Sequence, residues 1–422
     1  MYALVDANSF YAAAEKVFDP AIRQRPVVVL TNNDGCICAL CDKAKAIGVK
    51  KFGPYYQSKA LLAKHGAVIR SSNYELYDDL SNKMMQVVGA FAPDQHIYSI
   101  DECFLSFGNW QPDDGWHAYA QKIKQAVWQQ LRLPVGVGIG PTPTLAKAAS
   151  HAGKRLGDKN GIAVLDTPQT IASTLRQMAL TDVWGVGKRI AARLHALGVN
   201  DAWALAQSCP KAMRAQFSVE LARTITELNG TVCLHWDNID PVKKQVYSTR
   251  AFGCVQTTLQ ALREALAWHG EKVAEKVRRQ HSKVRTLTLF AHANPFASSG
   301  HYHKAVQHQF ARPTNDTRAI SAAARQAAET LFKPGVLFHK CGVGAIELID
   351  EAHIQPELFS SRDDNPALMQ CLDRINARYG SQTIGVGSKG RQQPWRMRRE
   401  YLSPQYTTNW RHLPKINCDI RQ

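Results

Sequence analysis

The chain has 422 residues, 45% of them hydrophobic and 21% charged, and its 52 Lys and Arg outnumber 35 Asp and Glu to give a net charge of +17. This length exceeds one ordinary hydrophobic core and predicts two to four domains, while the composition excludes a disordered or membrane-spanning chain. The positive charge favours a polyanionic partner such as a nucleic acid, although a generally basic soluble surface would give the same count.

Strands and helices alternate over roughly the first 165 residues, which predicts an α/β or α+β core. The predicted strands are residues 2–7, 27–30, two short strands within 96–107 that meet at Asp101-Glu102, 133–140 and 161–166. A first helix is predicted through Phe10, and a second follows the loop TNNDG and ends near Ile47-Gly48. Two more are predicted at 73–90 and 116–131. The last begins within TPTLAKAASHAGK, with Thr142 as its cap.

The second half of the chain changes character twice. From about 168 to 232 the pattern is all-helical, with glycine punctuation. Residues 240–350 are mixed and hold a long basic amphipathic helix, ALREALAWHGEKVAEKVRRQ, followed by the alternating strand VRTLTLFA. Beyond 350 we expect a linker and a partly ordered tail rich in Gly and Arg.

The N-terminal segment, MYALVDANSFYAAAEKVF, has no basic region before its apolar run and carries Asp6 within it. A secretory signal is therefore not expected, and we predict a cytoplasmic protein with no membrane partner. The ten cysteines fit reduced core residues. Cys36, Cys38 and Cys41 give one CxC and one CxxC, which also occur in zinc sites, but no second pair follows at a usual spacing.

Three carboxylates stand where apolar strands are predicted. Asp6 lies in the first strand, and Asp101 and Glu102 lie between two others. Burying an ionised carboxylate is costly unless a cation compensates it, and carboxylate oxygens are the ligands that Mg²⁺ prefers. Because neighbouring strand residues point to opposite faces, Asp101 and Glu102 can share one ion only at a turn or bulge. For a lone Asp, a turn or a helix cap is the alternative.

Three ordered motifs, DANSFYAAAE at 6–15, YSIDE at 98–102 and VGVGIGPTPTLAKAASHAGK at 135–154, resemble the core motifs of Y-family DNA polymerases, and the UmuC type in particular. The likeness extends over nearly the whole chain, including NNDGC, SSNYELY, DVWGVG and SPQYTT. It implies an α+β multidomain fold, a right-hand polymerase with a ferredoxin-like βαββαβ palm, small fingers, a helical thumb with a helix–hairpin–helix, and an α/β little finger. The implied bounds are palm 1–18 and 76–166, fingers 19–75, thumb 167–235, little finger 240–350, and a linker and partner-binding tail 351–422.

The resemblance also implies roles for individual residues. Two catalytic Mg²⁺ ions would be held by the side chains of Asp6, Asp101 and Glu102 and by the backbone carbonyl of Ala7, for in-line phosphoryl transfer. The residues implied to bind the dNTP are Phe10, Tyr11, Lys45, Ser99 and Lys154. Tyr11 falls on the steric gate, where its ring would clash with a ribose 2′-hydroxyl; without the motif, Phe10 and Tyr11 would fit core aromatics.

The fingers depart from the family pattern. Many relatives have Arg at the position of Lys45 and Tyr at the position of Asp42, whereas this chain reads CALCDKAKAIG. The contacts from the fingers to the triphosphate therefore stay open, and a solvated helix residue is the alternative for Lys45.

Two segments are predicted to hold primer–template DNA. Residues 183–199, VWGVGKRIAARLHALGV, predict a helix–hairpin–helix that brings Gly185, Gly187, Lys188 and Arg189 to a phosphate, with a plain helical hairpin as the alternative. Residues 243–285 are the densest cationic stretch, and the resemblance makes them the little finger. The contacts predicted there are Arg250, Arg278, Arg279 and Arg285, and a solvated helix face is the alternative for about half of that stretch.

The C-terminal region carries predicted partner sites. Gln355, Leu358 and Phe359 lie in QPELF, which resembles the peptide that docks bacterial polymerases onto the sliding clamp, although so short a motif also recurs by chance. Beyond 385, basic and aromatic residues alternate. In the UmuC-type group this region binds the processed UmuD-like dimer, with the RecA filament as activator.

The sequence thus predicts a template-directed DNA polymerase for low-fidelity translesion synthesis in the SOS response. A catalytically idle DNA-binding scaffold subunit of a damage-tolerance complex is the alternative, and loss of a carboxylate would have favoured it. A nucleotidyl cyclase shares the palm-like core, but the thumb hairpin and the basic region after 240 argue against that class.

Overall fold

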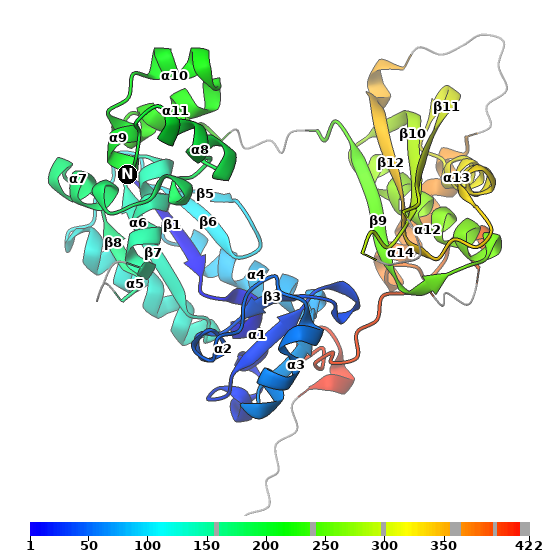
Figure 1. Ribbon diagram of the computed structural model, residues 1–422, viewed down its shortest axis with the longest axis horizontal. Helices are drawn as coiled ribbons and strands as arrows, with labels where there is room; N and C mark the ends of the chain where they lie inside the picture. Colours follow the sequence, from blue (N-terminus) through cyan, green and yellow to red (C-terminus); the bar gives the residue numbers. More distant parts are fainter. Residues whose placement is uncertain (156–159, 237–241, 297–300, 355–363, 391–394, 414–422) are drawn as a thin grey trace, which may run out of the picture. The chain divides into compact units, whose positions relative to one another are not determined.

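The computed structural model describes residues 1–155, 160–236, 242–296, 301–354, 364–390 and 395–413. The chain divides into two compact units, residues 1–238 with 400–422 and residues 239–399, and each is mixed α/β (Figure 1). The predicted α+β multidomain class is confirmed. No helix in the described ranges is long and apolar enough to span a membrane.

The first unit is built on a five-stranded sheet that corresponds to the predicted palm. Its order is β5 (Asp94–Ile97), β6 (Glu102–Ser106), β1 (Tyr2–Ala7), β7 (Val135–Gly140) and β8 (Ile162–Val164). β1 is central and antiparallel to β6 and β7. With α4 (Tyr74–Gly89) and α5 (Gly115–Leu131) as its two helices, this is the ferredoxin-like βαββαβ order.

Helices cover both faces of the palm sheet. Apolar side chains of α4 and α5 pack against Ala3, Val5 and Val137 in one large core. On the other face, α6 (Pro143–Arg155) contacts β1, β7 and β8. The approach of α6 is so close that a Cβ on Gly138 would come within 2.1 Å of the backbone nitrogen of Ser150, which explains a glycine in the middle of β7.

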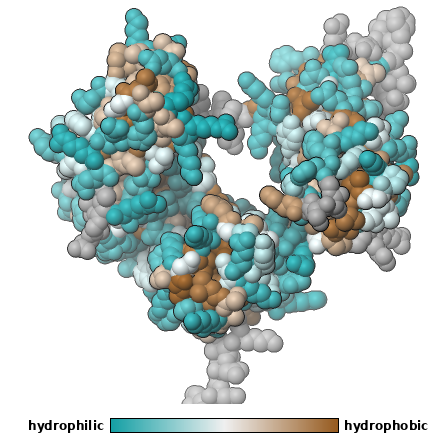
Figure 2. Space-filling model, in the orientation of Figure 1, coloured by the Kyte–Doolittle hydropathy of each residue, from teal (hydrophilic) through white to brown (hydrophobic). Residues whose placement is uncertain are grey.

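A smaller sheet follows α1 (Phe10–Val17), within the predicted fingers. Its order is β3 (Ile37–Leu40), β2 (Val27–Leu30) and β4 (Val68–Ser71), with α2 (Asp42–Ala46) and α3 (Tyr55–Lys64) beside it. The helix predicted after TNNDG is wrong over its first part, because ICAL pairs as a strand with β2 and the helix is only five residues long. Figure 2 shows hydrophobic surface over this part of the first unit.

The predicted all-helical stretch is confirmed. It contains α7 (Pro168–Arg176), α8 (Lys188–Ala196), α9 (Ala202–Ala206), α10 (Pro210–Gln216) and α11 (Val219–Leu228). Buried Glu227 links α11 to α6. Its carboxylate accepts hydrogen bonds from the Thr144 hydroxyl at 2.6 Å and from the Thr144 backbone nitrogen at 3.0 Å.

The second unit is an antiparallel sheet with helices on one face. The sheet order is β11 (His303–Thr314), β10 (Ser282–Ala293), β12 (Phe338–Asp350) and β9 (Val246–Gln256). The predicted basic helix is α12 (Leu259–Arg279), which packs with α13 (Thr317–Leu331) against this sheet.

The region after 350 is more structured than its composition indicated. Pro366–Tyr379 forms α14, and Trp395 is 1% exposed in the core of the second unit. Residues from 400 onward instead belong to the first unit. The expectation of one linker and tail misses this division because Met369 and Trp395 are buried only through tertiary contacts.

Candidate active site

The three predicted carboxylates lie at the same end of the palm sheet. β5 and β6 form a hairpin, with Ile97 paired to Cys103, and Asp101 lies in the bend directly before Glu102. The prediction that this pair lies at a turn is confirmed. Asp6 is the register partner of Glu102, so both side chains lie on the same face, and the backbone nitrogen of Ala7 donates to the carbonyl of Asp101 at 2.8 Å.

Two lysines of α6 hold two of these carboxylates. Lys154 Nζ lies 2.7 Å from Asp6 Oδ1, and Lys147 Nζ lies 3.0 Å from Glu102 Oε1. Burial raises the pKa of Asp6 and of Glu102, and the lysines oppose that rise. The sequence reasoning missed Lys147. It precedes Lys154 by seven residues on α6, two helical turns, so helical spacing would have put both on one face.

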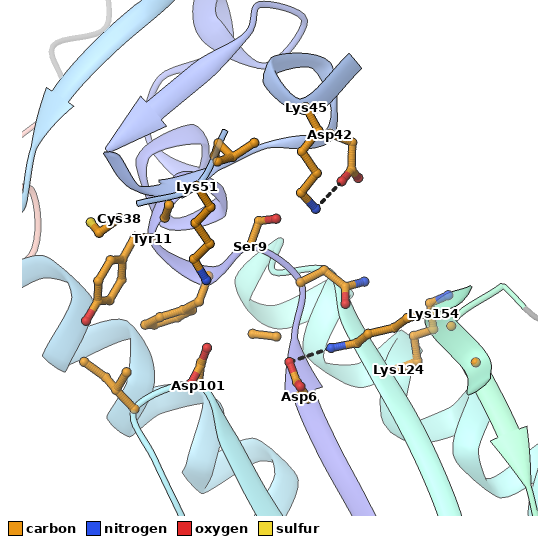
Figure 3. A pocket seen from close by; sticks show the side chains of 18 of the residues that line it. Asp6, Ser9, Tyr11, Cys38, Asp42, Lys45, Lys51, Asp101, Lys124 and Lys154 are labelled. Carbon is orange, nitrogen blue, oxygen red and sulfur yellow. Dashed lines mark hydrogen bonds and ion pairs between the residues drawn. The ribbon is translucent and has the colours of Figure 1, made fainter. Parts of the chain in front are cut away.

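A cavity of about 860 Å³ opens beside the carboxylates (Figure 3). It is lined by Asp6, Ala7, Phe10, Tyr11 and Asp101, and by lysines from several elements. Glu102 and Ser99 do not line it. The Ser99 hydroxyl instead donates to Asp101 at 2.6 Å and thereby supports that carboxylate.

Tyr11 forms one wall of the cavity. Its ring stacks on Tyr77 of α4 with the centroids 4.4 Å apart and the planes 14° apart. Burial raises the pKa of Tyr11 to about 12, so its hydroxyl stays neutral at physiological pH. Phe10 is 3% exposed and packs beside it, with ring centroids 5.9 Å apart. Ser9, before the helix, is in the left-handed region with φ 51°, where few non-glycine residues lie.

Among the described residues, four lysines line the cavity, and two of them were predicted from the sequence. Lys154 and Lys45 were predicted, and Lys51 and Lys124 were missed (Figure 3). Lys45 pairs with Asp42 at 2.9 Å, and the Lys45 side chain is 56% exposed. Lys124 of α5 donates to Asn160, and burial lowers the pKa of Lys124. A long solvated helix such as α5 gives no local signal that one of its lysines reaches a site.

The donor set fits a hard divalent cation by chemistry. Carboxylates at Asp6, Asp101 and Glu102 and the carbonyl of Ala7 are oxygen donors of the kind that Mg²⁺ prefers. In the part of the chain that the structure describes, no three metal-ligating side chains converge, because Asp6 and Glu102 are turned to their lysines.

The glycines of the predicted thumb hairpin lie directly before α8. Gly185 has φ +85°, which strongly favours glycine, and Gly187 caps α8 with open space around it. Lys188 and Arg189 are exposed in the first turn of α8.

The four predicted arginines of the second unit differ in their surroundings. Arg279 and Arg285 are exposed, and Arg250 lies over the Trp268 ring at 5.4 Å. Arg278 is only 10% exposed and forms a bidentate pair with Asp373 of α14, with both contacts at 2.7 Å. A guanidinium held in this way is not available to a phosphate, so we leave Arg278 out of the DNA interface. Gln355, Leu358 and Phe359 lie outside the described residues.

Comparison with known proteins covers most of the chain. Residues 5–151 match the impB/mucB/samB family, 243–358 match its C-terminal domain, 168–199 match the family's HHH motif, and 366–416 match a domain of unknown function. The chain is 36% identical to Protein UmuC of Salmonella typhimurium, over 99% of this chain and 100% of that protein. It is 33% identical to Protein MucB of Escherichia coli, over 98% and 99%.

The fold is similar to those of solved polymerases. The Y-family DNA polymerase chimera Dbh-Dpo4(243-245)-Dbh gives a TM-score of 0.64 at 19% identity, over 82% of this chain and 98% of that chain. Such low identity shows the fold alone. Identity of 36% over the full length shows more, and the chain belongs to the UmuC-type, impB/mucB/samB family of Y-family DNA polymerases.

Proposed function

We propose that this chain extends primers past damaged template bases with low fidelity in the SOS response, by nucleotidyl transfer with two Mg²⁺ ions. The observation that carries the proposal is the carboxylate end of the palm sheet, where Asp6 and Asp101 line a cavity bordered by lysines and Glu102 is the register partner of Asp6. Bound Mg²⁺ would supply activation of the primer 3′-hydroxyl and charge compensation for the leaving pyrophosphate.

The chain's own groups serve binding and orientation. Asp6, Asp101, Glu102 and the carbonyl of Ala7 would hold the ions. Lys154 leaves Asp6 and binds the triphosphate when the nucleotide enters. The other lysines of the cavity, Lys45, Lys51 and Lys124, add positive charge near the triphosphate. Tyr11, neutral and stacked on Tyr77, lies where a 2′-hydroxyl would meet its ring.

The thumb hairpin and the second unit bind the DNA. Backbone N–H groups at Gly187 and the first turn of α8 bind a phosphate. In the second unit, no helix of the described residues covers the sheet face opposite α12 and α13. β12 carries Gly342 and Gly344 on this face, and the Phe290 and Tyr247 rings lie against them. This surface binds the duplex through its backbone, and the exposed Arg285 of β10 adds positive charge beside it. Arg250, which lies over Trp268 of α12, and Arg279 of α12 are on the helix side of the sheet and are proposed to bind other phosphates. A processed UmuD-like dimer, the RecA filament and the sliding clamp remain the proposed protein partners.

Primer extension with Mg²⁺ on a template with an abasic site tests the proposal. Asp101→Asn and Glu102→Gln are expected to abolish extension. Asp114→Asn is the matched control, because Asp114 is an exposed palm carboxylate paired only with Lys122 in the described structure. Extension by Asp101→Asn at the wild-type rate would remove these carboxylates from catalysis and favour a scaffold role.

A further inference from the structure

The C-terminal segment at 400–406 packs into the first unit, beside the fingers (Figure 1). Its backbone lies beside β4, an edge strand of the smaller sheet. The Ser71 nitrogen donates to the Tyr401 carbonyl at 3.0 Å, and the Tyr401 nitrogen donates to the Ser71 hydroxyl at 3.0 Å. Tyr406 stacks on Phe18 with ring centroids 5.1 Å apart. Segments from opposite ends of the sequence therefore pack against each other.

Ser403 is the innermost residue of this segment, with 4% of its surface exposed. Its hydroxyl accepts a hydrogen bond from Asn73 Nδ2 at 2.9 Å and donates one to Glu15 Oε1 at 3.1 Å, across 388 residues of sequence. Asn73 is itself buried and caps α4 through the Leu76 nitrogen. The segment thus fixes both the start of α4 and the Glu15 carboxylate of α1.

Glu15 links Ser403 to the cavity wall. The carboxylate is 1% exposed, and its Oε1 also accepts the Tyr77 hydroxyl at 2.6 Å. Tyr77 is fully buried, and its ring is the one on which Tyr11 stacks. Burial raises the pKa of Glu15, and the hydrogen bonds from Tyr77 and Ser403, together with the charge of Arg70, oppose that rise.

A continuous set of contacts therefore runs from Ser403 through Glu15 and Tyr77 to Tyr11. We propose that residues 400–406 are a positioning strap for Tyr11, so that the C-terminal tail sets how strictly the polymerase rejects ribonucleotides. The inference rests on the proposed role of Tyr11 at the sugar. Glu15 Oε2 keeps its ion pair with Arg70 at 3.5 Å, but loss of the Ser403 hydrogen bond leaves Oε1 with Tyr77 as its one remaining partner among the described residues. The carboxylate can then shift towards Arg70, which loosens Tyr77 and lets the Tyr11 ring move away from a 2′-hydroxyl.

Single-nucleotide insertion by the full chain tests the strap. The readout is the ratio of kcat/KM for a dNTP to that for the matching rNTP. Ser403→Ala and Tyr77→Phe are each expected to lower this ratio about 5-fold, the effect of losing one hydrogen bond. Tyr77→Phe keeps the stacked ring, so it tests the same contacts without a change in packing. Thr408→Ala, at an exposed residue of the same tail, is the control and keeps the wild-type ratio.

Tyr11→Ala separates the strap from the role of Tyr11. If the strap acts through the ring, Ser403→Ala lowers the ratio no further in a Tyr11→Ala background. A ratio that falls in Tyr11→Ala but not in Ser403→Ala or Tyr77→Phe would overturn the strap and leave the proposed function intact. An unchanged ratio in Tyr11→Ala itself would overturn the gate and the strap with it. A purely structural role would slow insertion of both sugars equally and leave the ratio unchanged, which also counts against the strap.

Discussion

Asp6 and Glu102 lie opposite each other on the antiparallel strands β1 and β6, and each carboxylate is held by a lysine of the same helix, α6. The two lysines thus supply the positive charge that would otherwise have to come from bound cations. Lys147 lies in addition over the rings of Tyr98 and Trp184, at 4.3 Å and 5.0 Å, which fixes its position near Glu102.

Removal of Lys154 is expected to strengthen the response of the protein to Mg²⁺. Without Lys154, Asp6 keeps an uncompensated charge, so the metal-free protein loses about 1 kcal/mol of stability. Since a competing cation is gone, Mg²⁺ should then stabilise Lys154→Ala more than it stabilises the wild type. Thermal unfolding with and without Mg²⁺, in the absence of nucleotide, measures this. Lys122→Ala, which breaks an exposed pair with Asp114, is the control. A smaller Mg²⁺ effect in Lys154→Ala would contradict the expected competition.

The two glycines of the thumb hairpin should respond differently to alanine. Gly185 has φ +85°, so Gly185→Ala should lower the stability of the thumb by about 1 kcal/mol or more. Gly187 has no positive φ and no neighbour within 4 Å of an added Cβ, so Gly187→Ala should fold normally. If its backbone approaches a phosphate, Gly187→Ala nevertheless weakens DNA binding. Calorimetry measures the stability of the two variants, and DNA titration measures their affinity for DNA. Equal losses of stability in Gly185→Ala and Gly187→Ala would refute the argument from φ.

The sequence predicted the catalytic end of the palm better than its surroundings. The period-2 alternation required Asp101 and Glu102 to lie at a turn, and they do, because β5 and β6 pair as an antiparallel hairpin around them. The expectation of two apolar flanking strands is wrong for β5, whose residues DQHI are mostly polar, whereas the central residues of β6 are apolar and buried. Lys51, Lys124 and Ser403 were missed because their roles depend on tertiary neighbours distant in the sequence. Ser403 finds Glu15 across 388 residues, and no local pattern marks such a contact.

Arg278 shows why a count of positive charges overestimates an interface. Its guanidinium also donates to the Asn315 carbonyl at 2.7 Å, in addition to the pair with Asp373, so it joins α12 to α14. Arg278→Ala should therefore destabilise the second unit by about 3 kcal/mol and leave the salt dependence of DNA binding unchanged. Arg285→Ala should fold normally and lower the slope of log K against log salt by about 1. A lower slope in a folded Arg278→Ala variant would restore Arg278 to the interface.

His269 predicts a pH dependence that is confined to the second unit. The ring is 1% exposed, its Nδ1 lies 2.8 Å from the Ser248 hydroxyl, and its Nε2 has no hydrogen-bond partner among the described residues. Burial, with a smaller contribution from the charges of Arg250 and Lys276, lowers the pKa of His269 to about 3, from 6.5. The folded state therefore resists a proton that the unfolded state accepts.

The sign of the effect follows directly. The contribution of His269 to the free energy of unfolding is fully present above the unfolded pKa of 6.5. It decreases as the pH drops towards 3, by at most about 1.4 kcal/mol per pH unit. His269→Gln removes this one titration, so its free energy of unfolding should depend less on pH between 6.5 and 4.5, while other groups contribute equally to both proteins. Urea unfolding at several pH values, followed by the fluorescence of Trp268 and Trp395 in the same core, measures the slope. The exposed His117→Gln is the control, and a wild-type slope in His269→Gln would show that the folded core accepts the proton.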